Sequence, residues 1–198
     1  MIKRATDLVL ALLGLILLGP VLLLAMGWVW FDSTGPVFFR QERVGRRGRL
    51  FRIHKLRTMT VGAATQGPAV TGLADARVTR AGRWLRHYRI DELPQLIDVL
   101  RGDMSLVGPR PEVPRFVALY PPELRERVLA VRPGITDPAS LEFVDESELL
   151  AGSPDPERTY IDVILPRKLR RQAEYLERAD WKSDLAVIGR TLRLLVQR

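Results

Sequence analysis

The sequence contains no cysteine and only two histidines, His54 and His87. The lack of cysteine excludes disulfide bonds, thiolate metal sites and cysteine nucleophiles. So few histidines argue against a zinc enzyme and against a histidine-based catalytic triad. Acidic residues are also outnumbered, with 23 Asp and Glu against 31 Lys and Arg, which gives a net charge of +8. This positive excess favours a polyanionic partner such as nucleic acid, a phosphorylated substrate or anionic lipid.

One long apolar run, Leu8–Phe31, holds 24 residues without a charge. A helix of about 20 such residues can span a bilayer. The length of the run, and the absence of a small-residue cleavage site after it, argue against a signal peptide. Gly19 and Pro20 stand at its midpoint. Proline kinks or breaks a helix there, and each half is then about 18 Å long, which is too short for a core of about 30 Å.

Basic residues flank this run on both sides. Lys3 and Arg4 precede it, and the following segment is basic with only Glu42 opposing: Arg40, Arg43, Arg46, Arg47, Arg49, Arg52, Lys55 and Arg57. Positive charge is retained on the cytoplasmic side of a membrane. A segment that enters the membrane and returns satisfies both flanks, whereas a spanning segment satisfies one.

We therefore expect a re-entrant membrane helix over residues 1–34 and a cytoplasmic domain over 35–198. Trp28 and Trp30, near the exit of the apolar run, suit the membrane–water interface. A kinked helix that spans the membrane is the alternative, since neighbouring helices can satisfy the backbone beside a proline.

The rest of the chain predicts a mostly helical α+β domain with one small β-hairpin. The hairpin is expected over Pro36–Met59, with Gly45 and Gly48 bracketing its turn. A loop is expected over Thr60–Asp75, which is small, polar and glycine-rich. The remaining expectations are helices over Arg80–Arg89, Pro122–Val131, Arg167–Arg178 and Lys182–Val196, a helix and rigid loop within Ile90–Pro111, and irregular structure over Arg132–Phe143.

The last expected helix has an apolar face with basic residues beside it. Leu185, Ile188, Leu192 and Leu195 fall on one face, near Arg190, Arg193 and Arg198. An interfacial helix on anionic lipid has this pattern, and so does a helix packed on a protein core. Both interpretations stay open at this point.

The segment "RIDELPQL" places two acids before a helix. Pro94 suits the first turn of that helix, so Asp91 and Glu92 lie at or before its N-terminus. Acids at such positions commonly serve as caps and as partners of the helix dipole. Alternatively, Asp91 is an activated carboxylate that forms a covalent phosphoryl intermediate, which a helix N-terminus would also stabilise.

Several cations are candidates for phosphate binding. Arg110 lies between Pro109 and Pro111, and a guanidinium on so stiff a backbone can grip a phosphate with two hydrogen bonds, although a surface turn has the same pattern. Lys55 and Arg57 share one face of an expected strand, either as a cationic site or as an edge facing solvent or lipid. Asp103 could be a metal ligand, a partner of Arg110 or a cap.

Three segments, taken in order, resemble a known family. They are "FFRQERVGRRGRLFRIHKLRTM", "RIDELPQLIDVLRGDMSLVGPRP" and "RPGIT", and they resemble the bacterial sugar transferases, which are monotopic phosphoglycosyl transferases. The resemblance covers nearly the whole chain. It implies an N-terminal re-entrant helix broken at a proline, which in this chain corresponds to Gly19-Pro20.

The resemblance also implies a function. Family members move a sugar phosphate from a nucleoside diphosphate sugar, usually a UDP-sugar, to polyprenol (undecaprenyl) phosphate and release UMP. They are transferases of substituted phosphate groups and start the membrane-bound assembly of bacterial glycans. The expected location is the cytoplasmic face of the inner membrane, with anionic lipid and not nucleic acid as a neighbour.

By the same resemblance, Asp91 is the nucleophile of an acidic pair with Glu92, in a ping-pong reaction, and Mg²⁺ binds beside Asp91. The cations Lys55, Arg57, Arg86 and Arg110 match residues that bind the phosphates or the nucleotide. The chain departs from the family's pattern where "DPASLEFVDE" replaces a common Gly-Leu-Ala-Gln run, so the identity of the sugar does not carry over. Asp98 also stands where an Asn is common.

Two other functions are compatible with parts of the sequence. A non-catalytic basic module on a membrane surface, binding anionic lipid or nucleic acid, fits the charge but gives no role to "DELPQL" or "GDMSLVGPRP". A metal-dependent phosphodiesterase needs a denser carboxylate cluster than Asp91, Glu92 and Asp103 provide. Release of UMP from a UDP-sugar, dependent on polyprenol phosphate and Mg²⁺, distinguishes all three.

Overall fold

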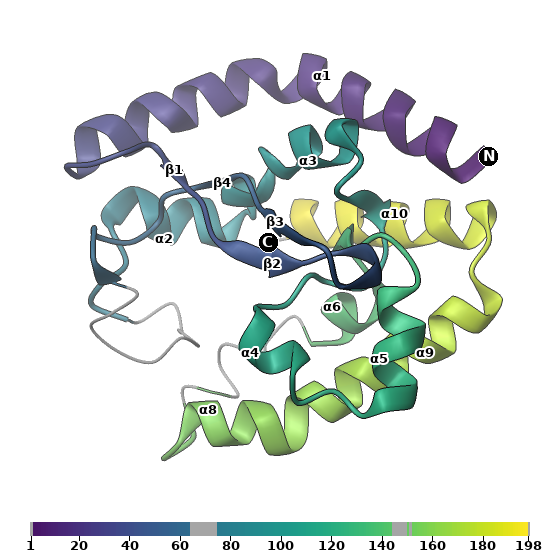
Figure 1. Ribbon diagram of the computed structural model, residues 1–198. Helices are drawn as coiled ribbons and strands as arrows, with labels where there is room; N and C mark the ends of the chain where they lie inside the picture. The colour runs from purple at the N-terminus through teal and green to yellow at the C-terminus, as the bar shows by residue number, and fades with distance from the viewer. Residues whose placement is uncertain (1, 64–74, 144–149, 151, 198) are drawn as a thin grey trace.

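The computed structural model describes residues 2–63, 75–143, 150 and 152–197. The expected loop Thr60–Asp75 therefore falls largely outside the described residues, as do Val144–Glu146 of the "DPASLEFVDE" segment and Arg198 of the C-terminal basic face. The fold is mostly helical with short strands, which confirms the coarse prediction. Figure 1 shows helix α1 (Ile2–Asp32) as an arch along one side of a body formed by the rest of the chain.

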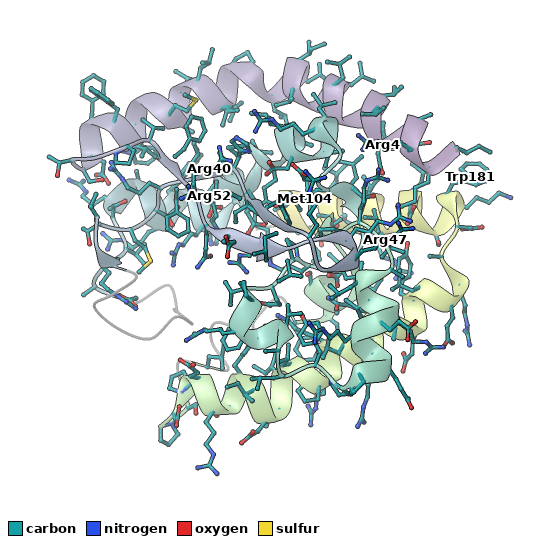
Figure 2. All side chains as sticks on the ribbon, in the orientation of Figure 1. Arg4, Arg40, Arg47, Arg52, Met104 and Trp181 are labelled. Carbon is teal, nitrogen blue, oxygen red and sulfur yellow. The ribbon has the colours of Figure 1, made fainter. Side chains whose placement is uncertain are left out.

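Helix α1 has its small side chains facing inward and its large apolar side chains facing outward. Ala11, Ala25 and Val29 are buried against the body, while Leu24 and Phe31 are 76% and 87% exposed. Figure 2 shows the carbon-rich side chains of α1 directed away from the body. The helix is long and apolar enough, by length and composition, to cross a membrane. This inverted distribution fits a helix whose outer face meets hydrocarbon and not water.

The prediction that the helix is broken at Gly19-Pro20 is wrong. Residues Ile2–Asp32 form one helix with Pro20 inside it. Both halves are held by the same body: Ala11 and Leu15 join one core cluster, and Ala25 and Val29 join another. A proline removes one backbone hydrogen bond, and a helix packed along its whole length can continue past that loss as a bend. The arch of α1 in Figure 1 has this form.

The predicted hairpin is confirmed in two paired sections. Strand β2 (Glu42–Val44) pairs antiparallel with β3 (Leu50–Arg52), and β1 (Phe38–Phe39) pairs with β4 (Lys55–Leu56). The turn η1 (Arg46–Gly48) joins β2 to β3, with the backbone φ angle positive at both Arg47 and Gly48. Glycine adopts this left-handed conformation without steric cost, which explains why Gly48 closes the turn.

Two predictions for the middle of the chain are wrong. The expected rigid loop contains strand β5 (Ser105–Val107), and the expected irregular segment contains strand β6 (Gly134–Thr136) and helix α6 (Pro138–Glu142). The two strands pair in parallel. A Cβ at Gly134 would lie 2.1 Å from the backbone nitrogen of Gly108, so the close approach of the two backbones at this point requires glycine. The pairing of distant three-residue strands gives almost no periodic signal in the sequence.

Five helices that the structure describes in the body were expected: α2 (Arg80–His87), α3 (Gln95–Arg101), α5 (Pro122–Leu129), α9 (Leu165–Arg178) and α10 (Trp181–Val196). Three others were not predicted: α4 (Pro114–Val117), α8 (Pro156–Thr159) and the π-helix η4 (Tyr160–Ile164). Helix α10 packs on the body through Asp184 and Val187 but leaves Leu185 and Leu192 41% and 57% exposed. Leu185 and Leu192 therefore lie outside the face that packs on the core, and their contact with lipid stays a prediction.

Candidate active site

Asp91 and Glu92 lie in a short 3-10 turn, η3 (Ile90–Glu92), between α2 and α3. Arg89 precedes the turn in the left-handed conformation, with φ 53°, and redirects the chain at the end of α2. Both acids are buried, with only 2% and 6% of their surface exposed. Pro94 is the N-cap of α3, and no side chain provides a capping hydrogen bond there. The interpretation of these acids as side-chain caps of α3 is therefore wrong.

Glu92 is held by cations from three parts of the chain. Arg110 donates to both of its carboxylate oxygens, to Oε1 through Nη2 and to Oε2 through Nη1. Lys55 Nζ lies 3.3 Å from Oε1, and Arg89 Nη1 lies 3.7 Å from Oε2. Burial acts to raise the pKa of Glu92, but the attraction of Arg110 and these neighbours outweighs burial and holds the pKa well below 4.5. Glu92 is therefore ionised.

Asp91 has the opposite electrostatic balance. Its Oδ2 lies 3.0 Å from the Nζ atom of Lys55. Burial raises the pKa of Asp91 above the ordinary 3.8, and the charge of Glu92 adds to this, while Lys55 and Arg86 act in the other direction. The pKa values of the two adjacent carboxyl groups therefore shift in opposite directions, up for Asp91 and down for Glu92. Such pairs are common at catalytic sites.

A cavity of about 390 Å³, which we call the cationic cavity, opens beside this pair. This volume lies in the ordinary range for a small-molecule site, about 300–1,000 Å³. Glu92 and the four cations predicted to bind substrate line it together: Lys55, Arg57, Arg86 and Arg110. Arg43, Arg77 and Gln95 also line it. Such a concentration of positive charge suits a ligand with several phosphate charges.

Two of the four predicted cations also have structural bonds. The guanidinium of Arg57 donates to the backbone carbonyls of Ser33 and Thr34, at 2.6 and 2.8 Å, and so closes the C-terminal end of α1. Arg86 donates through Nε to the hydroxyl of Thr58 at 2.8 Å. Arg57 therefore connects α1 to the cationic cavity, and a role for either residue in binding substrate stays a prediction.

The bacterial sugar transferase profile matches residues 1–198. The chain belongs to this family. It is 39% identical, over 98% of its length, to the UDP-glucose:undecaprenyl-phosphate glucose-1-phosphate transferase of Caulobacter vibrioides, and the match covers 69% of that protein. It is 43% identical, over 68% of its length, to the UDP-N-acetylgalactosamine-undecaprenyl-phosphate N-acetylgalactosaminephosphotransferase of Aeromonas hydrophila. The match spans about a third of the Aeromonas protein, 32%, so that relative has a long additional part.

This family member also contains a residue that the sequence analysis did not assign, Asp137. Its buried carboxylate caps α6 by accepting from the backbone of Ser140 at 2.7 Å, and it accepts from Gln172 at 3.1 Å. It also accepts from the backbone nitrogen of Arg110 at 2.9 Å. Asp137 therefore holds the backbone of the residue that grips Glu92. The Asp-Pro pair at a helix start is a capping signal, but the link to Arg110 depends on tertiary contact.

Two other acids, Asp98 and Asp103, lie apart from the pair of Asp91 and Glu92. Asp98 is buried and accepts from Nδ1 of His54 at 2.5 Å and from the backbone of His54 at 2.8 Å, so this transferase uses it to fix β4 against α3. Asp103 lines a different cavity, with Arg46, Arg47 and Arg132 among its neighbours. Within the described ranges, no group of three or more acids and histidines has the arrangement of a metal site.

Proposed function

We propose that this chain transfers a sugar 1-phosphate from a UDP-sugar to undecaprenyl phosphate and releases UMP. The observation that carries the proposal is the buried pair of Asp91 and Glu92 beside a cavity lined by at least four cations. Family membership and the activities named for the Caulobacter and Aeromonas relatives support the same substrates. Those two relatives use glucose and N-acetylgalactosamine, so the sugar is a separate question.

In the first step, a carboxylate oxygen of Asp91 attacks the β-phosphorus of the UDP-sugar. A bond forms between this oxygen and phosphorus, and the bond from the β-phosphorus to the bridging oxygen breaks, so UMP leaves with that oxygen. Lys55, Arg86 and Arg110 bind the phosphate oxygens and offset their charge. In the structure, Lys55 is paired with the carboxylate of Asp91. When Lys55 binds a substrate phosphate instead, the carboxylate is free to attack.

In the second step, a phosphate oxygen of undecaprenyl phosphate attacks the same phosphorus. The bond to Asp91 breaks, the carboxylate is regenerated, and undecaprenyl diphospho-sugar leaves. No proton needs to move in either step, because each attacking and leaving oxygen is anionic. A covalent intermediate of this kind lets a water-soluble donor and a lipid acceptor arrive at separate times.

Asp91 is the residue we assign to Mg²⁺, with Glu92 beside it. Mg²⁺ keeps several waters and typically takes one or two carboxylates together with substrate phosphates, so two adjacent acids, of which Glu92 lines the cationic cavity, fit its donor preference. When bound, the ion supplies further charge neutralisation at the diphosphate. Arg110 holds Glu92 through both carboxylate oxygens, so residues of the chain itself orient the pair.

We further propose that α1 is a re-entrant helix and that the body lies on the cytoplasmic face of the membrane. Both ends of α1 are tied to the same body. Lys3 Nζ lies 2.5 Å from Asp184 Oδ2 at one end, and Asp32 accepts from the backbone of Ala81 at 2.9 Å at the other. A helix that crossed the membrane fully would separate its ends by the bilayer thickness. The contact of Trp28 with Trp84, whose rings are tilted at 50° with centroids 5.6 Å apart, suits the interface.

The test is UMP release in detergent with a panel of UDP-sugars, in the presence and absence of undecaprenyl phosphate and Mg²⁺. The proposal predicts UMP release with at least one UDP-sugar and net product only when the acceptor is present. Binding to anionic vesicles without UMP release from any UDP-sugar would instead support the non-catalytic membrane module.

A further inference from the structure

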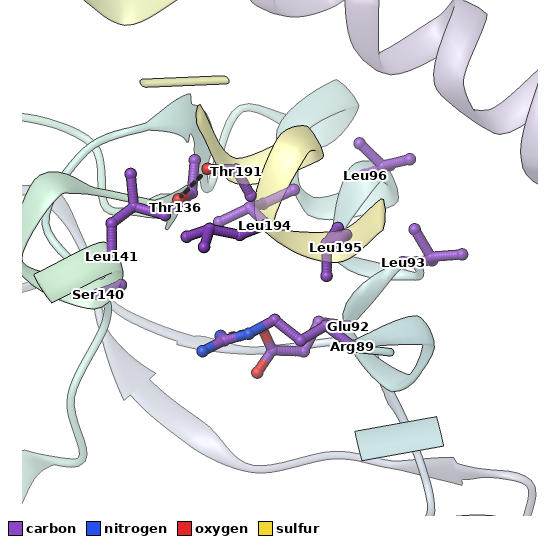
Figure 3. A pocket seen from close by; sticks show the side chains of 11 residues that line it. Arg89, Glu92, Leu93, Leu96, Thr136, Ser140, Leu141, Thr191, Leu194 and Leu195 are labelled. Atoms are coloured by element: carbon purple, nitrogen blue, oxygen red, sulfur yellow. Dashed lines mark hydrogen bonds and ion pairs between the residues drawn. The ribbon is translucent and has the colours of Figure 1, made fainter. Parts of the chain in front are cut away.

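A second cavity, which we call the apolar cavity, lies on another side of Glu92. Its volume is about 110 Å³, and its walls come from α3, α6, α10 and strand β6 (Figure 3). Leucine and isoleucine side chains dominate the lining: Leu93, Leu96, Ile135, Leu141, Leu194 and Leu195. Among the described residues, only Glu92 lines both the cationic cavity and the apolar cavity.

The polar side chains of the apolar cavity are mostly used within the protein. The hydroxyls of Thr136 and Thr191 are hydrogen-bonded to each other at 2.8 Å, and Thr191 also donates to the carbonyl of Val187. Ser140 donates to Asp137. The charged groups of the lining are Arg89 and Glu92, which form an ion pair with Nη1 3.7 Å from Oε2 and lie together in Figure 3 on the opposite side from Leu194. A ligand for this cavity therefore needs a hydrocarbon body, with any charge confined to the end at Arg89.

The apolar cavity also lies beside the membrane helix. Leu96, in its wall, points toward α1 in Figure 3, and its Cδ1 would lie 3.2 Å from a Cβ placed on Gly14. Leu96 packs in the same core cluster as Ala11 of α1. The wall of the cavity therefore connects the helix that meets hydrocarbon with the acidic pair.

We propose that the apolar cavity binds the isoprene unit next to the phosphate of the lipid acceptor, with that phosphate at Arg89. This inference rests on the proposed function and assigns a place to its second substrate. Apolar cavities of about 150 Å³ are known to bind benzene, so a cavity of about 110 Å³ suits a branched five-carbon unit. The acceptor then approaches the pair from the side of α1, while the donor occupies the cationic cavity.

The arrangement separates the two substrates by chemistry. The diphosphate of the donor is attracted to Lys55, Arg86 and Arg110, none of which lines the apolar cavity. The leucine-rich wall keeps the isoprene unit out of water when the phosphate end of the acceptor leaves the bilayer. Leu141 in that wall belongs to the "DPASLEFVDE" departure and Leu195 to the last helix, so these segments shape the acceptor site and not the donor site.

The test is a comparison of Leu195→Trp with Leu192→Trp on the same helix. Leu195 lines the apolar cavity, whereas Leu192 is 57% exposed and does not. Steady-state kinetics are measured in detergent with undecaprenyl phosphate and the UDP-sugar that the unmodified chain uses best. Filling the cavity in Leu195→Trp should raise the KM for undecaprenyl phosphate about tenfold or more. The KM for the UDP-sugar should stay within about twofold, and Leu192→Trp should change neither.

Unchanged acceptor KM in Leu195→Trp, or an equal rise in both KM values, would overturn the assignment. An unchanged value is also the result expected if the cavity holds a phospholipid acyl chain. Leu141→Phe fills the cavity from the opposite wall and gives the same test if Leu195→Trp does not fold. Failure of the unmodified chain to turn over any UDP-sugar with undecaprenyl phosphate refutes the proposed function instead, so the two failures are distinguishable.

Discussion

Arg110 grips Glu92 through both carboxylate oxygens, with Nη1 of the guanidinium 3.2 Å from Oε2 and Nη2 bonded to Oε1. This contact fixes the orientation of the acidic pair and keeps Glu92 ionised. Asp91, one residue earlier, is left with Lys55 as its main counterion and with a raised pKa. The difference supports separate roles for the two acids, Asp91 as the reacting carboxylate and Glu92 as a fixed anchor.

Replacing Arg110 with Lys should impair transfer although the charge is retained. An ammonium group cannot donate to both oxygens of Glu92 in the parallel geometry of a guanidinium. Loss of one charge-assisted hydrogen bond corresponds to about 10- to 100-fold in kcat/KM. The measurement is UMP release with Arg49→Lys, an exposed arginine outside the cationic cavity, as the control. Turnover close to that of the control would mean that Arg110 is a turn residue only.

The two acids should respond oppositely when their charges are removed. The folded-state pKa of Asp91 is raised above the ordinary value of 3.8. The protonated side chain therefore favours the folded state at low pH, and this contribution is lost as pH rises through the folded-state pKa. Its charge therefore destabilises the fold at neutral pH, and Asp91→Asn should unfold at equal or higher urea concentration. The pKa of Glu92 is depressed below 4.5, so its stabilisation is present at neutral pH and lost on acidification. Glu92→Gln should therefore destabilise the fold, by about 3 kcal/mol.

Transfer should fail in Asp91→Asn even though the fold persists. A neutral amide is a poor nucleophile, so UMP release should fall by more than about 10³-fold. Urea unfolding followed by circular dichroism, run beside the UMP assay, separates the two effects. An inactive Asp91→Asn chain that is also strongly destabilised would indicate a structural role for Asp91.

The pH dependence of kcat/KM should shift when Lys55 is replaced by Met. Asp91 must be ionised to attack, so activity falls as pH decreases through its raised pKa. Lys55 lowers that pKa, and its removal should raise it further and move the acid limb to higher pH. Lys182→Met, an exposed lysine on α10, is the control. An acid limb that stays in place would show that a different group titrates.

Single cysteines test the topology of α1 directly, because the chain has no cysteine of its own. A re-entrant helix places Ile2 and Thr34 on the same side, so both Ile2→Cys and Thr34→Cys should resist a membrane-impermeant thiol reagent in intact cells and react after lysis. Labelling at position 2 alone in intact cells would indicate a helix that spans the membrane. Pro20→Leu should shift part of the population toward spanning, because the straightened helix is long enough to cross.

Much of the local structure could be predicted from the sequence. The apolar run, the hairpin over Pro36–Met59 and the two C-terminal helices all carry periodic or compositional signals, and the structure contains each of them. The parallel pair of β5 and β6 was missed because three-residue strands are too short to show a period. The break at Pro20 was wrong because packing along the body holds both halves of α1 in one helix.

The acidic pair could be located from the sequence, but its surroundings could not. Pro94 and the family resemblance indicated Asp91 and Glu92, and all four predicted cations line one cavity. The grip of Arg110 on Glu92, and the bond from Asp137 that holds Arg110, join residues 18 and 27 positions apart. Such contacts depend on the folded arrangement of several elements, which no local pattern contains.

The central claim is that Asp91 forms a covalent bond to the sugar phosphate. The chain is incubated with the UDP-sugar and Mg²⁺, without undecaprenyl phosphate, and its intact mass is measured. An added sugar phosphate should map to Asp91, be absent in Asp91→Asn, and disappear when undecaprenyl phosphate is added. The absence of an adduct under single-turnover conditions, with UMP formed only when both substrates are present, would contradict this claim.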